Sequence, residues 1–167
     1  MEKMDYFFII LIFSIFVIGC TQNAATDSME KGSISNNKDS SVQERYTGNV
    51  LAGAVSKYLE FNKVDYEKAL NEKREVLLYF YADWCQICKA EQPQTIKAFN
   101  ELNNPDLIGF RINYNDKNTD ADEIELAKQF GITYQHTKII LKDKKQVLKA
   151  LDSWDKQRYL DEISKIE

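Results

Sequence analysis

The sequence predicts an α/β domain with a mixed central β-sheet flanked by helices, and three observations support this fold class. Strand-like and helix-like segments alternate from residue 57 onward. The continuous apolar run at 76–81 is typical of a central strand covered on both faces. Two strand-like segments around residues 142–145 indicate a hairpin. Because strands joined by helices run parallel and a hairpin is antiparallel, we expect a mixed sheet.

The spacing of the apolar residues assigns each element in turn. Pro93 lies inside the expected second helix and removes one hydrogen bond there, so we expect a bend. Gly131 is placed to end the third helix, and Ser153 to cap the last one. The expected elements are strands at 57–61, 76–81, 107–114, 137–141 and 146–151, helices at 64–74 and 85–102, a helix capped by Thr119 or Asp120 that runs to Gln129, and a final amphipathic helix with Leu160 and Ile163.

Length and charge narrow the class of protein. The chain has 167 residues and a net charge of −4. Without its N-terminal segments it has room for one domain of roughly 110 to 120 residues. Its basic residues form no long run, so we do not expect a nucleic-acid partner.

The N-terminus carries an apolar segment at residues 6–18, interrupted by Ser14. It is shorter than the ~20 residues of a transmembrane helix and fits the core of a signal peptide. The sequence Val-Ile-Gly-Cys at 17–20, which overlaps the end of this segment, resembles a bacterial lipobox, which implies removal of residues 1–19 and lipid attachment at Cys20. The alternatives are a buried N-terminal helix, an uncleaved anchor, or an incidental buried cysteine.

Residues 20–45 are rich in Ser, Asn, Asp and Lys and poor in large apolar side chains. Such a segment cannot bury enough surface to offset the entropy lost on ordering. We expect it to be a lipidated, flexible tether that joins the membrane to a folded domain at 46–167.

Cys85 and Cys88 are separated by two residues at the expected start of a helix. The first position faces unpaired backbone N–H groups and the positive end of the helix dipole, which favour a thiolate. We therefore expect Cys85 to attack a substrate disulfide and Cys88 to resolve the mixed disulfide. A single Cys-x-x-Cys is also half of a zinc site, but no second such motif follows.

The segment Tyr-Phe-Tyr-Ala-Asp-Trp-Cys-Gln-Ile-Cys-Lys at 79–89, with Pro93 after it, resembles the active-site segment of the thioredoxin superfamily. The resemblance covers about residues 55–166. It implies a thioredoxin-like fold and disulfide exchange with protein thiols, with no cofactor beyond the dithiol. It also implies that Trp84 is a partly exposed platform beside the dithiol rather than a core aromatic residue. Lys89 is expected to be a solvated helix residue whose charge assists a nearby thiolate.

The segment departs from thioredoxin at two places. Tyr79 stands where the family has a buried acid that assists the resolving thiol. Asp83 or Glu91 could substitute for that acid, but we expect each to be a solvent-facing charge. The dipeptide between the cysteines lacks the proline common in the family. Because this dipeptide helps to set the reduction potential in the family, the resemblance does not give the potential of this protein.

A third departure is His136, the chain's only histidine, which aligns with the family's cis-proline. This alignment places the imidazole opposite the dithiol, where it would stabilise a thiolate or accept a proton; the alternative is that it only fills space. By the same resemblance, the backbone of Gln135 is expected to pair with a bound substrate chain.

The leading hypothesis is a thiol–disulfide oxidoreductase, lipid-anchored to a membrane of the bacterial cell envelope. Its partners would be protein thiols and disulfides outside the cytoplasm and a further redox partner that recharges the dithiol, with reduction favoured over oxidation. One alternative is a copper- or zinc-binding module using Cys85, Cys88 and His136. Another is an interaction domain with a vestigial disulfide.

Overall fold

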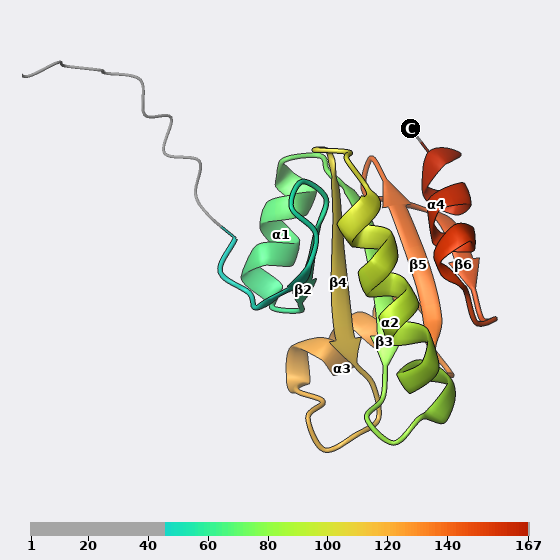
Figure 1. The fold of residues 1–167 in the computed structure, drawn as a ribbon. Helices are drawn as coiled ribbons and strands as arrows, with labels where there is room; N and C mark the ends of the chain where they lie inside the picture. Colours follow the sequence, from blue (N-terminus) through green and yellow to red (C-terminus); the bar gives the residue numbers. More distant parts are fainter. Residues whose placement is uncertain (1–45, 167) are drawn as a thin grey trace, which may run out of the picture. The chain divides into compact units, whose positions relative to one another are not determined.

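The computed structural model describes residues 46–166, which form one six-stranded sheet with helices on both faces (Figure 1). The strand order is β1-β2-β4-β3-β5-β6. The expected mixed α/β sheet is therefore confirmed. The strands are β1 (Val50–Ala52), β2 (Lys57–Glu60), β3 (Glu75–Tyr81), β4 (Leu107–Asn113), β5 (Thr137–Lys142) and β6 (Lys145–Ala150), and the helices are α1 (Lys63–Asn71), α2 (Gln86–Glu101), α3 (Ala121–Gln129) and α4 (Lys156–Ser164).

Strand β3 lies inside the sheet, as its continuous apolar run predicts. It pairs in parallel with β4 and antiparallel with β5. Every residue of β3 except Tyr81 is buried. The β5–β6 hairpin supplies the second antiparallel pair on this side, so parallel and antiparallel ladders coexist.

The alternating side chains of β3 enter two different cores. Val76, Leu78 and Phe80 pack with residues of α1 and α3, whereas Leu77 and Tyr79 pack with residues of α2 and α4. Helices α1 and α3 therefore cover one face of the sheet and α2 and α4 the other, which is the two-sided cover expected for a central strand (Figure 1).

Two details of the predicted elements were wrong. The sequence pattern did not reveal β1, because a strand of three residues is too short to show a period. The last helix is capped by Asp155 and not by Ser153: the Asp155 carboxylate accepts a hydrogen bond from the N–H of Arg158. Trp154, between the two candidates, is buried and takes the chain inward before the helix begins.

Two turns contain residues with a left-handed backbone. Gly131, directly after the C-cap of α3, has a φ of 57°, a left-handed conformation in which glycine avoids strain. Asp143 and Lys144 also have positive φ, at 51° and 63°, which suits a tight two-residue turn between β5 and β6.

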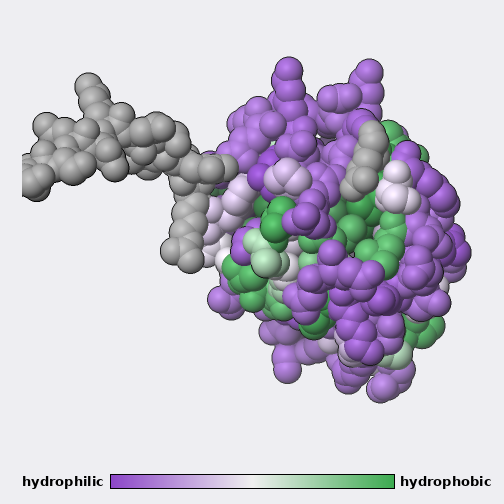
Figure 2. All heavy atoms as spheres, turned by 45° about the horizontal axis from the view of Figure 1, so that its top comes forward, coloured by the Kyte–Doolittle hydropathy of each residue, from purple (hydrophilic) through white to green (hydrophobic). Residues whose placement is uncertain are grey.

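The topology brings three chain segments to one edge of the sheet. The parallel strands β3 and β4 both end there, and β5 begins there because it is antiparallel to β3. The loops at this edge contain Cys85, Asn115 and His136. Figure 2 brings the opposite end of the domain forward and shows a mostly hydrophilic surface with several apolar areas among the polar side chains.

The predicted signal peptide at 1–19, the predicted lipid attachment at Cys20 and the predicted tether up to residue 45 fall outside the described residues. Within 46–166, no helix has the length and apolar character required to span a bilayer.

Candidate active site

Cys85 is the N-cap of α2, one residue before the helix begins. Its extended backbone lets its sulfur accept a hydrogen bond from the N–H of Cys88, with 3.1 Å between Sγ and N. At this N-cap position a serine, threonine or aspartate side chain usually accepts a hydrogen bond from a backbone N–H of the first helical turn. A sulfur there receives a hydrogen bond from a backbone N–H and lies at the positive end of the helix dipole.

The two cysteines differ in exposure, and burial affects the proton of Cys88. Both cysteines are free thiols, and Cys85 is 4% exposed whereas Cys88 is 0% exposed. Burial, followed by the hydrogen bond to Cys85, raises the pKa of the Cys88 thiol to about 12. Cys88 therefore keeps its proton at neutral pH, and Cys85 is the less buried of the two cysteines.

Trp84 flanks the dithiol and is 51% exposed. Its indole Nε1–H donates to the carbonyl of Asn115, at 3.0 Å, and the N–H of Asp83 donates to the Asp116 carboxylate, at 2.9 Å. These two bonds hold the loop after β3 against the loop after β4. Trp84 thus presents a fixed apolar surface next to Cys85.

Lys89 and Pro93 are both exposed on α2. The helix continues through Pro93 from Gln86 to Glu101.

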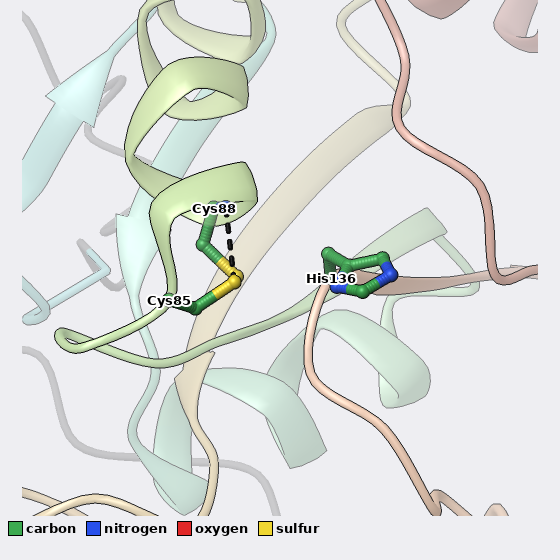
Figure 3. Close-up of side chains that lie close together, drawn as sticks. All are labelled: Cys85, Cys88 and His136. Atoms are coloured by element: carbon green, nitrogen blue, oxygen red, sulfur yellow. Dashed lines mark hydrogen bonds between the residues drawn. The ribbon is translucent and has the colours of Figure 1, made fainter.

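His136 reaches the dithiol from the loop before β5. Thr137 pairs with Phe80 near the end of β3, so the preceding residue projects beyond the sheet edge towards the start of α2. The sulfurs of Cys85 and Cys88 and a ring nitrogen of His136 all lie within 4.8 Å of one another (Figure 3). Gln135, beside it, is half-buried, and its pairing with a substrate backbone stays a prediction.

The conformation of His136 is unusual. Its φ is 51°, a left-handed backbone that few non-glycine residues adopt. The loop is held by Thr137, whose hydroxyl donates to the carbonyl of Tyr134 at 2.7 Å. The Nδ1 atom of His136 is buried and has no hydrogen-bond partner.

The expectation that Glu91 faces solvent was wrong. Glu91 is 1% exposed and lies on the inner face of α2. Its Oε1 accepts hydrogen bonds from Lys138 Nζ at 2.7 Å, the Tyr159 hydroxyl at 2.8 Å and the Trp154 N–H at 3.1 Å. Asp83, the other candidate acid, is partly exposed and pairs with Lys117 at 3.5 Å.

Lys138 is the buried cation of this network. Its side chain is fully buried on β5, and its Nζ also donates to the carbonyl of Asp152. Burial lowers the pKa of Lys138, while the Glu91 carboxylate opposes this shift. The ammonium also lies over the rings of Tyr79 and Trp154, 5.5 and 5.2 Å from their centroids.

Tyr79 links this network to the dithiol. Its hydroxyl donates to Glu91 Oε2 at 3.4 Å and also hydrogen-bonds to Cys88. The strand position that holds an acid in the resembled family is thus filled by a phenol, and the buried carboxylate comes from α2 instead. The signal in the sequence was its spacing: Glu91 lies three residues after Cys88, on the same helix face.

A family model for thioredoxin matches residues 57–165. The chain belongs to the thioredoxin family. The predicted resemblance is therefore confirmed for the folded domain.

Curated thioredoxin-like proteins match parts of the chain. A chloroplastic thioredoxin-like protein of Oryza sativa subsp. japonica is 28% identical over 115 residues, covering 68% of this chain and 42% of that protein. A thioredoxin-like protein of Fusarium culmorum is 34% identical over 82 residues, covering 48% and 63%. The protein disulfide-isomerase of Gallus gallus is 39% identical over 75 residues, covering 44% and 14%. The chain thus spans less than two thirds of the length of each relative.

Solved thioredoxin structures share the fold. Thioredoxin f from spinach chloroplast superposes with a TM-score of 0.54 at 25% identity, covering 67% of this chain and 95% of that one. Thioredoxin from Aeropyrum pernix superposes with a TM-score of 0.55 at 16% identity, covering 74% and 98%. At that identity the second likeness concerns the fold alone.

The thioredoxin domain should depend on the Glu91–Lys138 pair for stability. Lys138→Met leaves a buried carboxylate without its cation, and we expect a loss of about 3–5 kcal/mol in the free energy of unfolding, measured by urea titration. The double variant Glu91→Gln/Lys138→Met removes both charges and keeps an acceptor for Tyr159, so it should recover most of the loss.

Lys156→Met is the matched control, because it breaks an exposed ion pair with Glu101, 2.8 Å across. We expect it to change the free energy of unfolding by about 0–1 kcal/mol. A Lys138→Met loss no larger than the control's would contradict a structural role for the buried pair.

The two active-site thiols should react at different pH values. Because alkylation consumes thiolate and the pKa of Cys88 is raised to about 12, iodoacetamide at pH 8 should modify Cys85 and spare Cys88 in the reduced, native protein. Peptide mass spectrometry would measure both rates, and in urea both cysteines should react. Equal rates in the native state would show that the asymmetry is absent.

Proposed function

We propose that the protein is a thiol–disulfide oxidoreductase that exchanges disulfides with protein substrates. The observation that carries this proposal is the asymmetry of the dithiol. Cys85 Sγ caps α2 and accepts the Cys88 N–H, while buried Cys88 keeps its proton. One sulfur is thus prepared to attack and the other is held back.

The reaction consists of two exchanges. The Cys85 thiolate attacks one sulfur of a substrate disulfide, which releases one substrate thiolate and forms a mixed disulfide. Cys88 then gives up its proton and attacks the Cys85 sulfur, which releases the second substrate thiolate. Two electrons pass to the substrate, its two thiolates take up protons, and the Cys85–Cys88 disulfide remains. The Tyr79 hydroxyl donates its one proton to Glu91 at rest and would turn it towards Cys88 to stabilise the charge that forms there.

The surface around the dithiol suits a protein substrate. Trp84, Ile87 and Tyr134 are large apolar side chains and are 51%, 48% and 59% exposed. Trp84 directly precedes Cys85, and Ile87 lies between the two cysteines in the sequence. Tyr134 lies two residues before His136. An extended substrate segment could pack on them while its backbone pairs with Gln135. This exchange needs no cofactor beyond the dithiol.

The proposed location is the extracytoplasmic side of a bacterial membrane. It is supported by the apolar segment at 6–18, by the Val-Ile-Gly-Cys sequence ending at Cys20, and by the polar stretch up to residue 45. A diacylated or triacylated cysteine would hold the chain at the membrane, because each buried methylene contributes ~0.8 kcal/mol. The substrates would then be envelope proteins, with reduction as the favoured direction and a separate partner restoring the dithiol.

Cys85 and Cys88 should have separable roles in catalysis. We expect Cys85→Ser to abolish insulin reduction by the full chain with a thiol reductant. Cys88→Ser should also lose turnover but accumulate a mixed disulfide between Cys85 and insulin, because the resolving thiol is missing. Non-reducing electrophoresis would detect that adduct.

Unchanged insulin reduction in Cys85→Ser would refute the proposal and favour an interaction domain with a vestigial dithiol. Equilibration with glutathione would give the direction, since a potential near about −270 mV suits a reductant and one near about −120 mV an oxidant.

Lipid attachment should depend on Cys20. We expect bacterial cells expressing the full chain to incorporate a labelled fatty acid into the protein and to retain it in the membrane fraction. Cys20→Ser should abolish the label, with Ser14→Ala as the control that keeps it. A label that persists in Cys20→Ser would show that the anchor lies elsewhere.

A further inference from the structure

We propose that the reduced forms of Cys85 and Cys88, together with His136, bind one thiophilic metal ion, Cu(I), in addition to taking part in disulfide exchange. Their ligand atoms come from two separate elements, the start of α2 and the loop before β5. All three atoms lie within 4.8 Å of one another, and they are the one such group of metal-binding side chains found among residues 46–166. Figure 3 shows both sulfurs lying beside the imidazole.

The second observation is the state of His136 itself. Its Nδ1 is buried and has no hydrogen-bond partner in the protein. Leaving a buried polar atom unpaired costs free energy, and in proteins such atoms almost always have a hydrogen-bond partner or a ligand. The left-handed backbone at this residue, with a φ of 51°, adds a further local cost. A metal ion bound by the lone pair of this nitrogen would offset part of both costs.

The ligand set selects the type of metal. Two thiolates and one imidazole are soft ligands, which favour Cu(I) and zinc over calcium or magnesium. Zinc prefers four ligands and would need a water or an external group to complete its tetrahedron. Cu(I) accepts three ligands, and this site supplies three. Cys88 is 0% and Cys85 4% exposed, so the ion would be shielded from water by the protein.

Metal binding and disulfide exchange would exclude each other. Binding replaces the two thiol protons by the ion and releases them, while neutral His136 contributes a lone pair. When the dithiol reduces a substrate disulfide, the two sulfurs lose two electrons, bond to each other and no longer bind the metal as thiolates. Cu(I) keeps its oxidation state and leaves. The site would therefore hold copper in its reduced form only.

The test uses the full chain carrying Cys20→Ser, so that no third cysteine competes, in mild detergent and fully reduced. Titration against a colorimetric Cu(I) chelator should give one ion per chain. His136→Ala should weaken binding by at least about tenfold, because the change removes a direct ligand. Thr133→Ala, on the same loop and exposed, should bind as the parent does.

His136→Cys supplies another soft ligand and should restore binding, which separates loss of a ligand from loss of folding. X-ray absorption on the parent should show two sulfur ligands and one nitrogen ligand. Equal Cu(I) affinity in the parent and in His136→Ala, or retention of Zn²⁺ with no Cu(I), would overturn the proposal. The two proposals have separate assays. Copper binding without insulin reduction would support the metal site and contradict the proposed oxidoreductase function.

Discussion

The structure around the active site depends on one buried ion pair, Glu91 with Lys138. An isolated charge in a protein interior is costly, and here both charges have no solvent exposure. The carboxylate is satisfied by donors from α4, from the segment before it and from two strands, so the pair joins the elements on this face of the sheet. Buried pairs seldom add net stability compared with apolar side chains, but each charge strongly restricts where the other can lie.

This restriction also positions the functional groups. Glu91 follows Cys88 by one turn of α2, and Lys138 follows His136 by two residues at the start of β5. The 2.7 Å contact between the charges therefore fixes the first turn of α2 relative to the loop that carries the imidazole. The sulfurs therefore lie close to His136 because of the buried Glu91–Lys138 contact as well as the conformation of the loop before β5.

The parts of the fold that were predicted from sequence are those with a repeating pattern. The apolar run of β3, the period of α2 and the hairpin between β5 and β6 each follow from burial of one or both faces, and the residues around the dithiol identified the family. The buried network was missed because periodicity classes glutamate and lysine as surface residues. Lys138 interrupts the apolar strand 137–141, and a charge in a central strand requires a counter-ion. That inconsistency could have led to Glu91, whereas Trp154 and Tyr159 come from a distant segment that no local pattern connects.

The two tryptophans of the chain lie in contrasting surroundings. Trp84 is half exposed beside the sulfurs. Trp154 is 2% exposed and contacts the buried Glu91–Lys138 pair. A disulfide quenches the excited state of a neighbouring indole, whereas a buried indole changes its emission wavelength when water reaches it. The intrinsic fluorescence of this protein would therefore carry two signals, with intensity following the oxidation of the dithiol through Trp84 and spectral position following the opening of the interior through Trp154.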